Sequence, residues 1–253
     1  MPRPPHSRAV AEPAFLVPDW PAPARVRAAV TLRTGGVSGG PFASFNLGDH
    51  VGDDAAAVTS NRALLRRVLH LPSEPLWLRQ VHGCDVARFD GTSQPTADAA
   101  VSVRTGEVCA VLVADCLPVL FADRAGTCVA AAHAGWRGLA AGVLERTIEA
   151  LPAEPATLLA WLGPAIGPTA FEVGNEVRDR FIALQRGADA DFERAPNGRW
   201  RADLWSLARR QLIAGGVRAI HGGQGCTYSE WQRYYSYRRD GITGRLAALI
   251  WLE

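Results

Sequence analysis

Three short motifs interrupt the apolar runs of this chain, each at the edge of a segment with the pattern of a β-strand. They occupy residues 79–83, 114–118 and 132–138. The motifs contain His82, Cys116 and His133, which together offer two imidazoles and one thiolate. Three such ligands with a fourth position open match a catalytic zinc site rather than a closed structural one. A Cys–His nucleophile pair could use the same residues, so two kinds of chemistry stay open.

Apolar periodicity predicts strands and helices along most of the chain. Strands are expected at residues 26–32, 76–81, 108–113, 119–122, 127–132, 157–162, 217–220 and 246–251. Helices are expected from Asp53 or Asp54 to about His70, and at residues 139–151, 172–184 and 202–213. This mixture predicts an α/β (mixed α+β) fold, a single layered domain with a mixed central sheet flanked by helices. We expect residues 1–25 to form a loose tail and residues 26–253 to form the domain.

Composition and charge exclude several functions. The net charge of +2 gives no electrostatic reason to expect a nucleic-acid partner. Lysine is absent, so neither a Schiff-base lysine nor a P-loop lysine is available. No apolar run reaches the roughly 18 residues of a membrane span, and none near the N-terminus resembles a signal peptide. Five cysteines without framework spacing favour reduced thiols. We therefore expect a soluble, cytoplasmic protein without a membrane partner.

The positions of the three candidate ligands favour a functional site. His133 ends an apolar run and precedes Gly135 and a predicted helix, which is where α/β sheets place ligand sites. Cys116 also follows an apolar run, and its polar neighbour Asp115 marks a break in the strand. His82 stands where small and polar residues interrupt a strand. The sequence therefore places three metal-competent side chains at strand termini.

The ligand set suits zinc or copper. Blue copper usually adds a weak axial methionine, and the only methionine here is Met1. A multicopper oxidase needs many more histidines than the six present, and no His-x-His pair occurs. Zinc with an open position for water or phosphate is therefore the better prediction, with copper as an adventitious substitute.

Arginines near the motifs are candidate anion contacts. Arg137 follows His133 near a predicted helix start, where an anion can be gathered. Arg238 lies in the segment 234–245, which mixes tyrosines, arginines and glycines. That segment could form a wall for a flat base and an anion clamp, or it could be a solvated surface turn.

Further polar residues are candidate substrate contacts or acid–base groups. Asn46, Arg62 and Gln80 could contact a substrate, although turn chemistry explains Asn46 equally well. Asp98 is a candidate general acid or base, or else a helix or turn cap. Glu172 is a second candidate, or else a carboxylate in the first turn of a helix.

Several long motifs in the same order resemble the laccase-domain, or YfiH, family, whose members have been called polyphenol oxidases, peptidoglycan editing factors and purine nucleoside phosphorylases. The resemblance covers the chain from about Val26 onward. The matching motifs are residues 34–38, 46–48, 80–83, 114–116, 133–138, 163–167, 171–174, 226–227 and 236–241. Two departures are Phe45 in place of a usual leucine and the additional thiol of Cys84, which could compete for metal.

The resemblance implies that His82, Cys116 and His133 bind zinc. It also implies phosphorolysis of purine nucleosides (adenosine, inosine or methylthioadenosine) to free base and sugar 1-phosphate, with adenosine deamination as a companion activity. The implied fold is a mixed α/β domain similar to bacterial deamidase toxins that use a Cys–His pair. Purine nucleosides and inorganic phosphate are the expected partners, and a monomer or weak homodimer is expected.

Three alternatives stay open. A metal-free hydrolase could use Cys116 as nucleophile and His133 as base on an amide, as in editing of peptidoglycan precursors. A non-catalytic protein would bind its ligand without forming product. Copper at the same three ligands could support polyphenol oxidation, since copper outcompetes zinc at such sites, although we consider this an unlikely native role.

Overall fold

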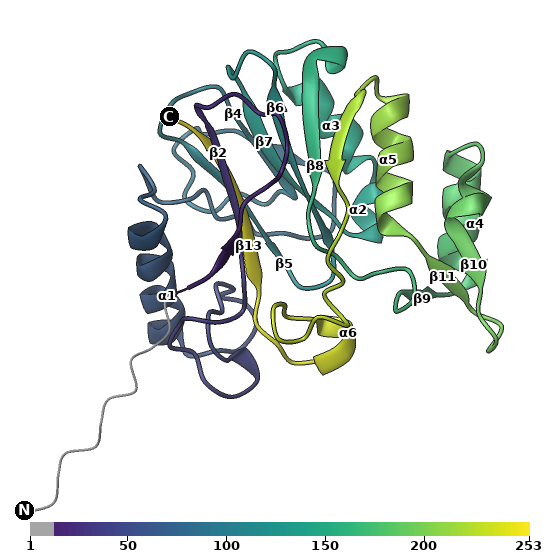
Figure 1. Ribbon diagram of the computed structural model, residues 1–253, viewed down its shortest axis with the longest axis horizontal. Coiled ribbons are helices and arrows are strands. Elements are labelled where there is room, and N and C mark those ends of the chain that lie inside the picture. Colours follow the sequence, from purple (N-terminus) through teal and green to yellow (C-terminus); the bar gives the residue numbers. More distant parts are fainter. Residues whose placement is uncertain (1–12) are drawn as a thin grey trace, which may run out of the picture.

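The computed structural model describes residues 13–253, in which two main β-sheets stack face to face between helices (Figure 1). The four-stranded sheet is antiparallel, in the order β1-β2-β13-β5. Its strands are β1 (Phe15–Leu16), β2 (Val26–Thr31), β13 (Leu246–Leu252) and β5 (Val108–Val113). Helix α1 (Ala55–Val68), which Asp54 caps by accepting a hydrogen bond from the Ala56 amide, packs its apolar face on the outer side of this sheet.

The six-stranded sheet is mixed, in the order β12-β8-β6-β7-β4-β3. The β12–β8 and β3–β4 pairs are parallel and the others are antiparallel. Its strands are β12 (Ala219–Gly222), β8 (Leu158–Leu162), β6 (Leu117–Asp123), β7 (Val129–Ala134), β4 (Ala99–Ser102) and β3 (Val86–Ala87). Strands β6 and β7 are buried on both faces, because the other sheet covers one face and helices cover the other.

Three helices cover the outer face of the six-stranded sheet: α2 (Trp136–Ala141), α3 (Val143–Ala150) and α5 (Leu204–Ala214). Helix α4 (Asn175–Leu184) lies farther from this sheet and packs against α2 (Figure 1). A small sheet in the order β10-β11-β9 lies beside α4. It contains β10 (Phe192–Arg194), β11 (Trp200–Ala202) and β9 (Glu172–Val173). The short helix α6 (Tyr237–Asp240) precedes β13, and 3-10 turns span Gly40–Phe42, Pro155–Thr157 and Ala188–Asp191.

The expected fold class is confirmed, and its central layer consists of two stacked sheets rather than one. The predicted loose tail extends too far along the chain. Phe15 and Leu16 pair with Thr31 and Val30, and Trp20 packs against the core between the sheets. Residues 1–12 of that tail lie outside the described residues.

Three predicted elements differ in the structure. Residues 76–81 form isolated bridges rather than a strand, because Leu76 and Arg79 each meet a different neighbour. The helix predicted over 139–151 is two helices, since Gly142 adopts φ +90° and breaks it. The helix predicted from Glu172 begins at Asn175, because Glu172 pairs with Arg201 in the small sheet.

Phe121 tests how tightly the helix-covered face of β6 is packed. Its ring is fully buried, and its partners on the adjacent strands, Ala130 and Ala160, are too small to fill the space that it occupies. The Phe121→Ala variant is therefore expected to lose about 3–5 kcal/mol of unfolding free energy, measured by chemical denaturation. The matched control Val103→Ala, at a half-exposed side chain, is expected to change it by less than about 0.5 kcal/mol. Similar losses in both variants would contradict this packing.

Candidate metal centre and active-site cavity

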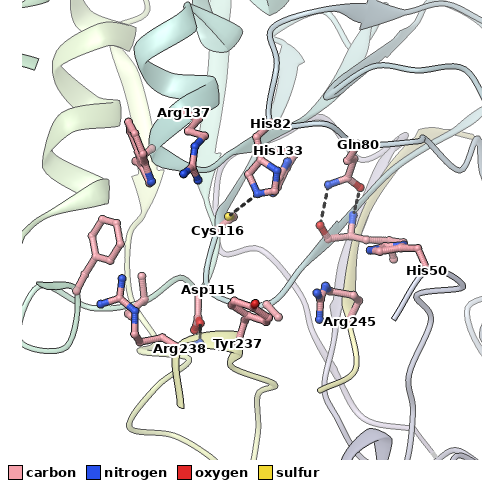
Figure 2. A pocket seen from close by; sticks show the side chains of 15 residues that line it. His50, Gln80, His82, Asp115, Cys116, His133, Arg137, Tyr237, Arg238 and Arg245 are labelled. Atoms are coloured by element: carbon pink, nitrogen blue, oxygen red, sulfur yellow. Dashed lines mark hydrogen bonds between the residues drawn. The ribbon is translucent and has the colours of Figure 1, made fainter. Parts of the chain in front are cut away.

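Strand pairing brings two of the predicted ligands together. Pro118 pairs with His133 across the β6–β7 ladder, so Cys116, just before β6, lies beside the end of β7. His82 reaches the same point from the turn that follows Gln80, with φ +61° at its own backbone. The Cys116 Sγ and His82 Nε2 atoms are 3.8 Å apart, and one donor atom of each of the three residues lies within 4.8 Å of the others (Figure 2).

Asp98 fixes the positions of His82 and His133 through hydrogen bonds. Its fully buried carboxylate accepts hydrogen bonds from the backbone amides of Val81, His82 and Gly83 at 3.1, 2.9 and 2.7 Å. It also lies 2.8 Å from His133 Nδ1. A carboxylate at Nδ1 directs the other imidazole nitrogen toward a metal, as in carboxylate–histidine–zinc triads.

The same contacts give Asp98 a positioning role in place of the predicted general acid or base. Burial alone would raise the pKa of the carboxyl group, but the His133 and backbone hydrogen bonds outweigh it and lower the pKa. An ionised carboxylate whose oxygens already accept four hydrogen bonds is not a proton donor, and Asp98 does not line the cavity.

The donor set fits a tetrahedral metal ion. Zinc bonds of about 2.3 Å to sulfur and 2.0–2.1 Å to nitrogen imply a sulfur-to-nitrogen separation of about 3.6 Å, close to the 3.8 Å between Cys116 and His82. Gly135 is also required here, since a Cβ on it would lie 2.7 Å from Cys116 Sγ and 3.3 Å from His82 Cδ2. These three residues can therefore hold a metal ion. Cys84 does not belong to the group and packs against the helix-covered core instead.

Without metal, the geometry favours a charged thiolate–imidazolium pair. Burial raises the pKa of the Cys116 thiol, but the His133 and His82 rings outweigh it and lower the pKa to about 6. Burial in turn lowers the pKa of His133, but Cys116 and Asp98 outweigh it and raise the pKa to about 9. Between these values both groups are ionised, which suits either metal binding after loss of the His133 proton or nucleophilic attack by sulfur.

Alkylation of the metal-free protein by iodoacetamide tests whether the pKa of the Cys116 thiol is lowered. The thiolate is the reactive form, so the rate at Cys116 is expected to rise with pH around a midpoint of about 6, against an ordinary thiol value of 9.0. Stoichiometric zinc is expected to protect Cys116. Peptide mass spectrometry resolves the labelled cysteine, and the Cys116→Ala variant is the control. A midpoint near 9, or labelling that zinc does not slow, would contradict the assigned geometry.

The candidate ligands open into a cavity of about 550 Å³ with two distinct sides (Figure 2). One side carries Trp136, Ile166 and Phe171 together with Arg137 and Arg238. The Arg137 guanidinium lies 4.5 Å from the Trp136 ring centroid, and that of Arg238 lies 5.4 Å from the Phe171 centroid. This side therefore combines flat apolar surface with positive charge.

The other side carries His50, Gln80, Leu112, Tyr237 and Arg245. The side-chain amide group of Gln80 forms hydrogen bonds within the protein. It donates to the Leu112 carbonyl at 2.8 Å and accepts from the Leu112 backbone amide at 2.7 Å. Gln80 thus lines the cavity, as predicted for a substrate contact, while its polar atoms continue the backbone pairing of β5. The polar atoms that this side offers to a ligand belong to His50, Tyr237 and Arg245.

Asp115 fixes the floor of the cavity. Its backbone adopts φ +88°, and its carboxylate accepts hydrogen bonds from Thr227 Oγ1 at 2.7 Å and from the Arg238 amide at 2.6 Å. These contacts join the residue before Cys116 to the segment that carries Tyr237 and Arg238. The short Asp115 side chain thereby couples the ligand cluster to the cavity wall.

Besides Asp98, three predicted site residues lie outside the cavity lining. Asn46 is fully buried, and its Oδ1 accepts hydrogen bonds from the backbone amides of Gly48 and Arg245. Arg62 donates to the Leu47 carbonyl and stacks on Trp77 at 4.2 Å. Glu172 accepts a hydrogen bond from Asn197 at 3.0 Å, outside the cavity that the candidate metal ligands line, and only its backbone carbonyl contacts Arg238. Asn46 and Arg62 therefore support the loop around residue 48.

Five of the lining residues that were not predicted individually carry aromatic or basic side chains. Trp136, Phe171, Tyr237 and Arg245 all fall within motifs or segments singled out in the sequence, where composition could not say which side chains face inward. His50 is isolated in an ordinary loop and carried no signal of its own.

These features define an α/β protein with a three-ligand metal-competent centre at the bottom of a two-sided cavity. Residues 27–253 match the family described as multi-copper polyphenol oxidoreductase laccase, and the chain belongs to this family. The laccase-domain, or YfiH, resemblance is thus confirmed. Among residues 13–253 one group of three or more histidine, cysteine or acidic side chains is placed to hold a metal ion.

The chain is similar over nearly its whole length to proteins named purine nucleoside phosphorylase. One from Pseudomonas aeruginosa is 56% identical over 95% of this chain and 99% of its own. Another from Escherichia coli, YfiH, is 53% identical over 94% and 98%. A crystal structure of a Neisseria meningitidis protein superposes with a TM-score of 0.90 at 50% identity, covering 94% of this chain and 99% of that one. No helix within residues 13–253 is both long and apolar enough to cross a membrane.

Proposed function

We propose that this chain is a zinc-dependent purine nucleoside phosphorylase with a companion adenosine deaminase activity. Its substrates would be inorganic phosphate and adenosine, inosine or methylthioadenosine, and its products the free base and a sugar 1-phosphate. The observation that carries the proposal is the His82–Cys116–His133 centre, which opens into a cavity of nucleoside size. The names of the similar proteins support it. We further propose that residues 26–253 act as one catalytic domain in the cytoplasm, as a monomer or weak homodimer.

The three ligands would hold the metal, and Asp98 would orient the His133 ring. When bound, zinc supplies a Lewis acid that polarises an oxygen of phosphate or substrate. Trp136 and Phe171 offer an apolar wall for the flat purine. Arg137 and Arg238 border that wall, where we first predicted phosphate contacts.

Phosphorolysis breaks the bond between the sugar C1′ and the purine nitrogen. Positive charge builds on the sugar as that bond lengthens, as in glycoside hydrolysis, and a nearby phosphate anion stabilises it. Neither predicted carboxylate reaches the reacting centre, since Asp98 and Glu172 do not line the cavity. We therefore infer that the leaving purine takes up its proton from water and that the attacking phosphate releases one to water.

Measurement of bound metal and of base release tests the proposal. The protein is purified without added metal, its zinc content is determined, and it is incubated with inosine or adenosine with and without phosphate. Chromatography is expected to show base release that requires phosphate and scales with zinc content. Inosine formed from adenosine without phosphate would support the companion deamination. Stoichiometric zinc without base or inosine would contradict the proposal.

The second candidate is a Cys–His hydrolase acting on an amide, such as a peptidoglycan precursor. The lowered pKa of Cys116 beside His133 is the observation that favours it. This activity would persist after chelation, whereas phosphorolysis would not. A test on amide substrates with and without chelator therefore separates the two candidates. Polyphenol oxidation would require copper at the same three ligands and should disappear when zinc replaces it.

A further inference from the structure

We propose that Arg245 and His50 form the binding site for inorganic phosphate, on the side of the cavity opposite Trp136 and Phe171 (Figure 2). This inference deepens the proposed phosphorolysis and rests on it for the identity of the second substrate. It replaces Arg137 and Arg238 as the predicted phosphate contacts and assigns them to the purine side.

Arg245 is a cation whose remaining donors have no protein partner. Its Nη1 donates to the backbone carbonyls of Thr243 and Gly244 at 2.9 and 3.1 Å, which fixes the guanidinium in place. Its Nε and Nη2 find no hydrogen-bond acceptor among residues 13–253, and no carboxylate there lies within ion-pair distance. A half-buried guanidinium that faces a cavity and has no ion-pair partner among residues 13–253 is suited to bind an anion.

The surrounding loop is built closely around Arg245. A Cβ on Gly48 would lie 2.7 Å from Arg245 Cγ, so only glycine allows the loop to approach the side chain. Asn46 bridges both segments by accepting from the Gly48 and Arg245 amides at 2.9 and 2.8 Å. The loop thereby carries His50 to the same side of the cavity as Arg245.

The nearest carboxylate on that loop is already paired. Asp49 lies 3.4 Å from the Arg62 guanidinium and 3.4 Å from His50 Nδ1. Arg62 is itself held by the Leu47 carbonyl, so its charge offsets that of Asp49 beside the proposed site. The His50 Nε2 atom then remains available to donate to a phosphate oxygen when that nitrogen is protonated.

The arginines on the other side are less suited to the anion. Both guanidinium groups lie over aromatic rings, and Arg238 Nη1 already donates to the Glu172 carbonyl at 2.9 Å. The aromatic surface beside them suits a flat base rather than phosphate. With the purine there, phosphate on the Arg245 side would face the sugar carbon from the opposite direction to the leaving base.

That placement gives a balanced substitution. An oxygen of dihydrogen phosphate donates an electron pair to C1′ as the C1′–N bond breaks and its electron pair moves to the purine. The phosphate releases one proton to water on its side of the sugar, and the purine nitrogen takes up one proton from water on the other side. The products are therefore the neutral base and the sugar 1-phosphate. Arg245 stabilises the phosphate charge but exchanges no proton.

Steady-state phosphorolysis of inosine by the full-length, zinc-loaded protein tests the site, with phosphate and inosine varied separately. Arg245→Gln and His50→Gln are expected to raise the KM for phosphate at least about tenfold, because charge-assisted hydrogen bonds are lost. The KM for inosine is expected to change less than about threefold, and Arg245→Lys to recover part of the phosphate KM. The matched control is Arg146→Gln, whose side chain is exposed and pairs with Glu149 on α3.

Direct binding is measured by the rise in melting temperature that inorganic phosphate causes in the zinc-loaded protein. Arg245→Gln is expected to abolish this rise while retaining zinc and a cooperative transition, which separates lost binding from misfolding. If the wild-type protein releases no base, the proposed function fails, and the phosphate-induced rise still decides whether Arg245 binds the anion.

Three results would overturn the site. One is a phosphate KM within twofold of wild type in both Arg245→Gln and His50→Gln. Another is a larger effect on phosphate KM from Arg137→Gln or Arg238→Gln. The third is a melting-temperature rise with adenosine 5′-monophosphate that depends on Arg245 while the rise with inorganic phosphate does not, since Arg245 would then bind a nucleotide phosphate.

Discussion

Cys116→Ala is expected to lose bound zinc and to lower the kcat/KM of phosphorolysis by more than 100-fold. Loss of a residue that only orients a ligand typically costs about 10–100-fold in metal affinity or activity, and removal of a ligand should cost more. The sulfur of Cys116 lies within 4.8 Å of donor atoms of both His82 and His133, and alanine supplies no donor in its place. Zinc content by mass spectrometry and base release by chromatography measure the two losses.

Cys84→Ala is the matched control, because it removes a nearby thiol outside the ligand group. It is expected to retain stoichiometric zinc and at least half of the wild-type kcat/KM. This control also settles whether the additional thiol competes for metal. Full turnover by Cys116→Ala would show that neither the zinc mechanism nor the Cys–His alternative uses this residue.

The sequence was sufficient to predict Cys116 and His133 as neighbours of one site for a physical reason. Cys116 follows the apolar run that becomes β5 and lies just before β6, and His133 stands at the end of the run that becomes β7. The antiparallel pairing of β6 with β7 brings the two residues together. Strands buried on both faces have a continuous apolar sequence. Polar residues at the ends of such strands can therefore be recognised without a structure. The same pattern of apolar runs predicts the α/β class. His82, in contrast, follows a segment that forms only isolated bridges, so it does not stand at a strand end.

The features that the sequence did not predict depend on contacts between segments that are far apart in the chain. Arg245 and His50 are separated by almost the whole domain, and nothing local to either residue specifies that both line one cavity. Glu172 and Asn46 have local patterns that fit a functional role equally well, and only tertiary packing assigns their side chains elsewhere. Local patterns also cannot distinguish one central sheet from two, because both present the same buried strands.

Asp98 shows how tertiary contacts can favour one of two roles that the sequence leaves open. The sequence offered a general acid or base and a cap as alternatives. Its carboxylate caps the turn at residues 81–83 and orients His133 at the same time, so one buried group positions two of the three residues that could hold a metal ion. This double attachment predicts that changes at Asp98 act on metal affinity before they act on chemistry.

Asp98→Asn is therefore expected to weaken zinc binding by about 10–100-fold, measured by competition with a chromogenic chelator. The amide keeps the size of the side chain but removes its charge. It also replaces one acceptor oxygen with a donor, which must face either a backbone amide or the His133 ring. One unsatisfied buried donor costs about 1–3 kcal/mol of folding free energy, so a matching loss is expected in chemical denaturation.

Saturating zinc separates the positioning role from a direct catalytic one. If Asp98 only positions its neighbours, excess zinc should restore most of the kcat of Asp98→Asn, whereas a lost proton donor would leave kcat low at any zinc concentration. The matched control Asp179→Asn, at an exposed carboxylate on α4 beside Arg178, is expected to change neither zinc affinity nor stability measurably. Zinc affinity within twofold of wild type in Asp98→Asn would contradict the positioning role, because the His133 orientation would then not depend on the carboxylate.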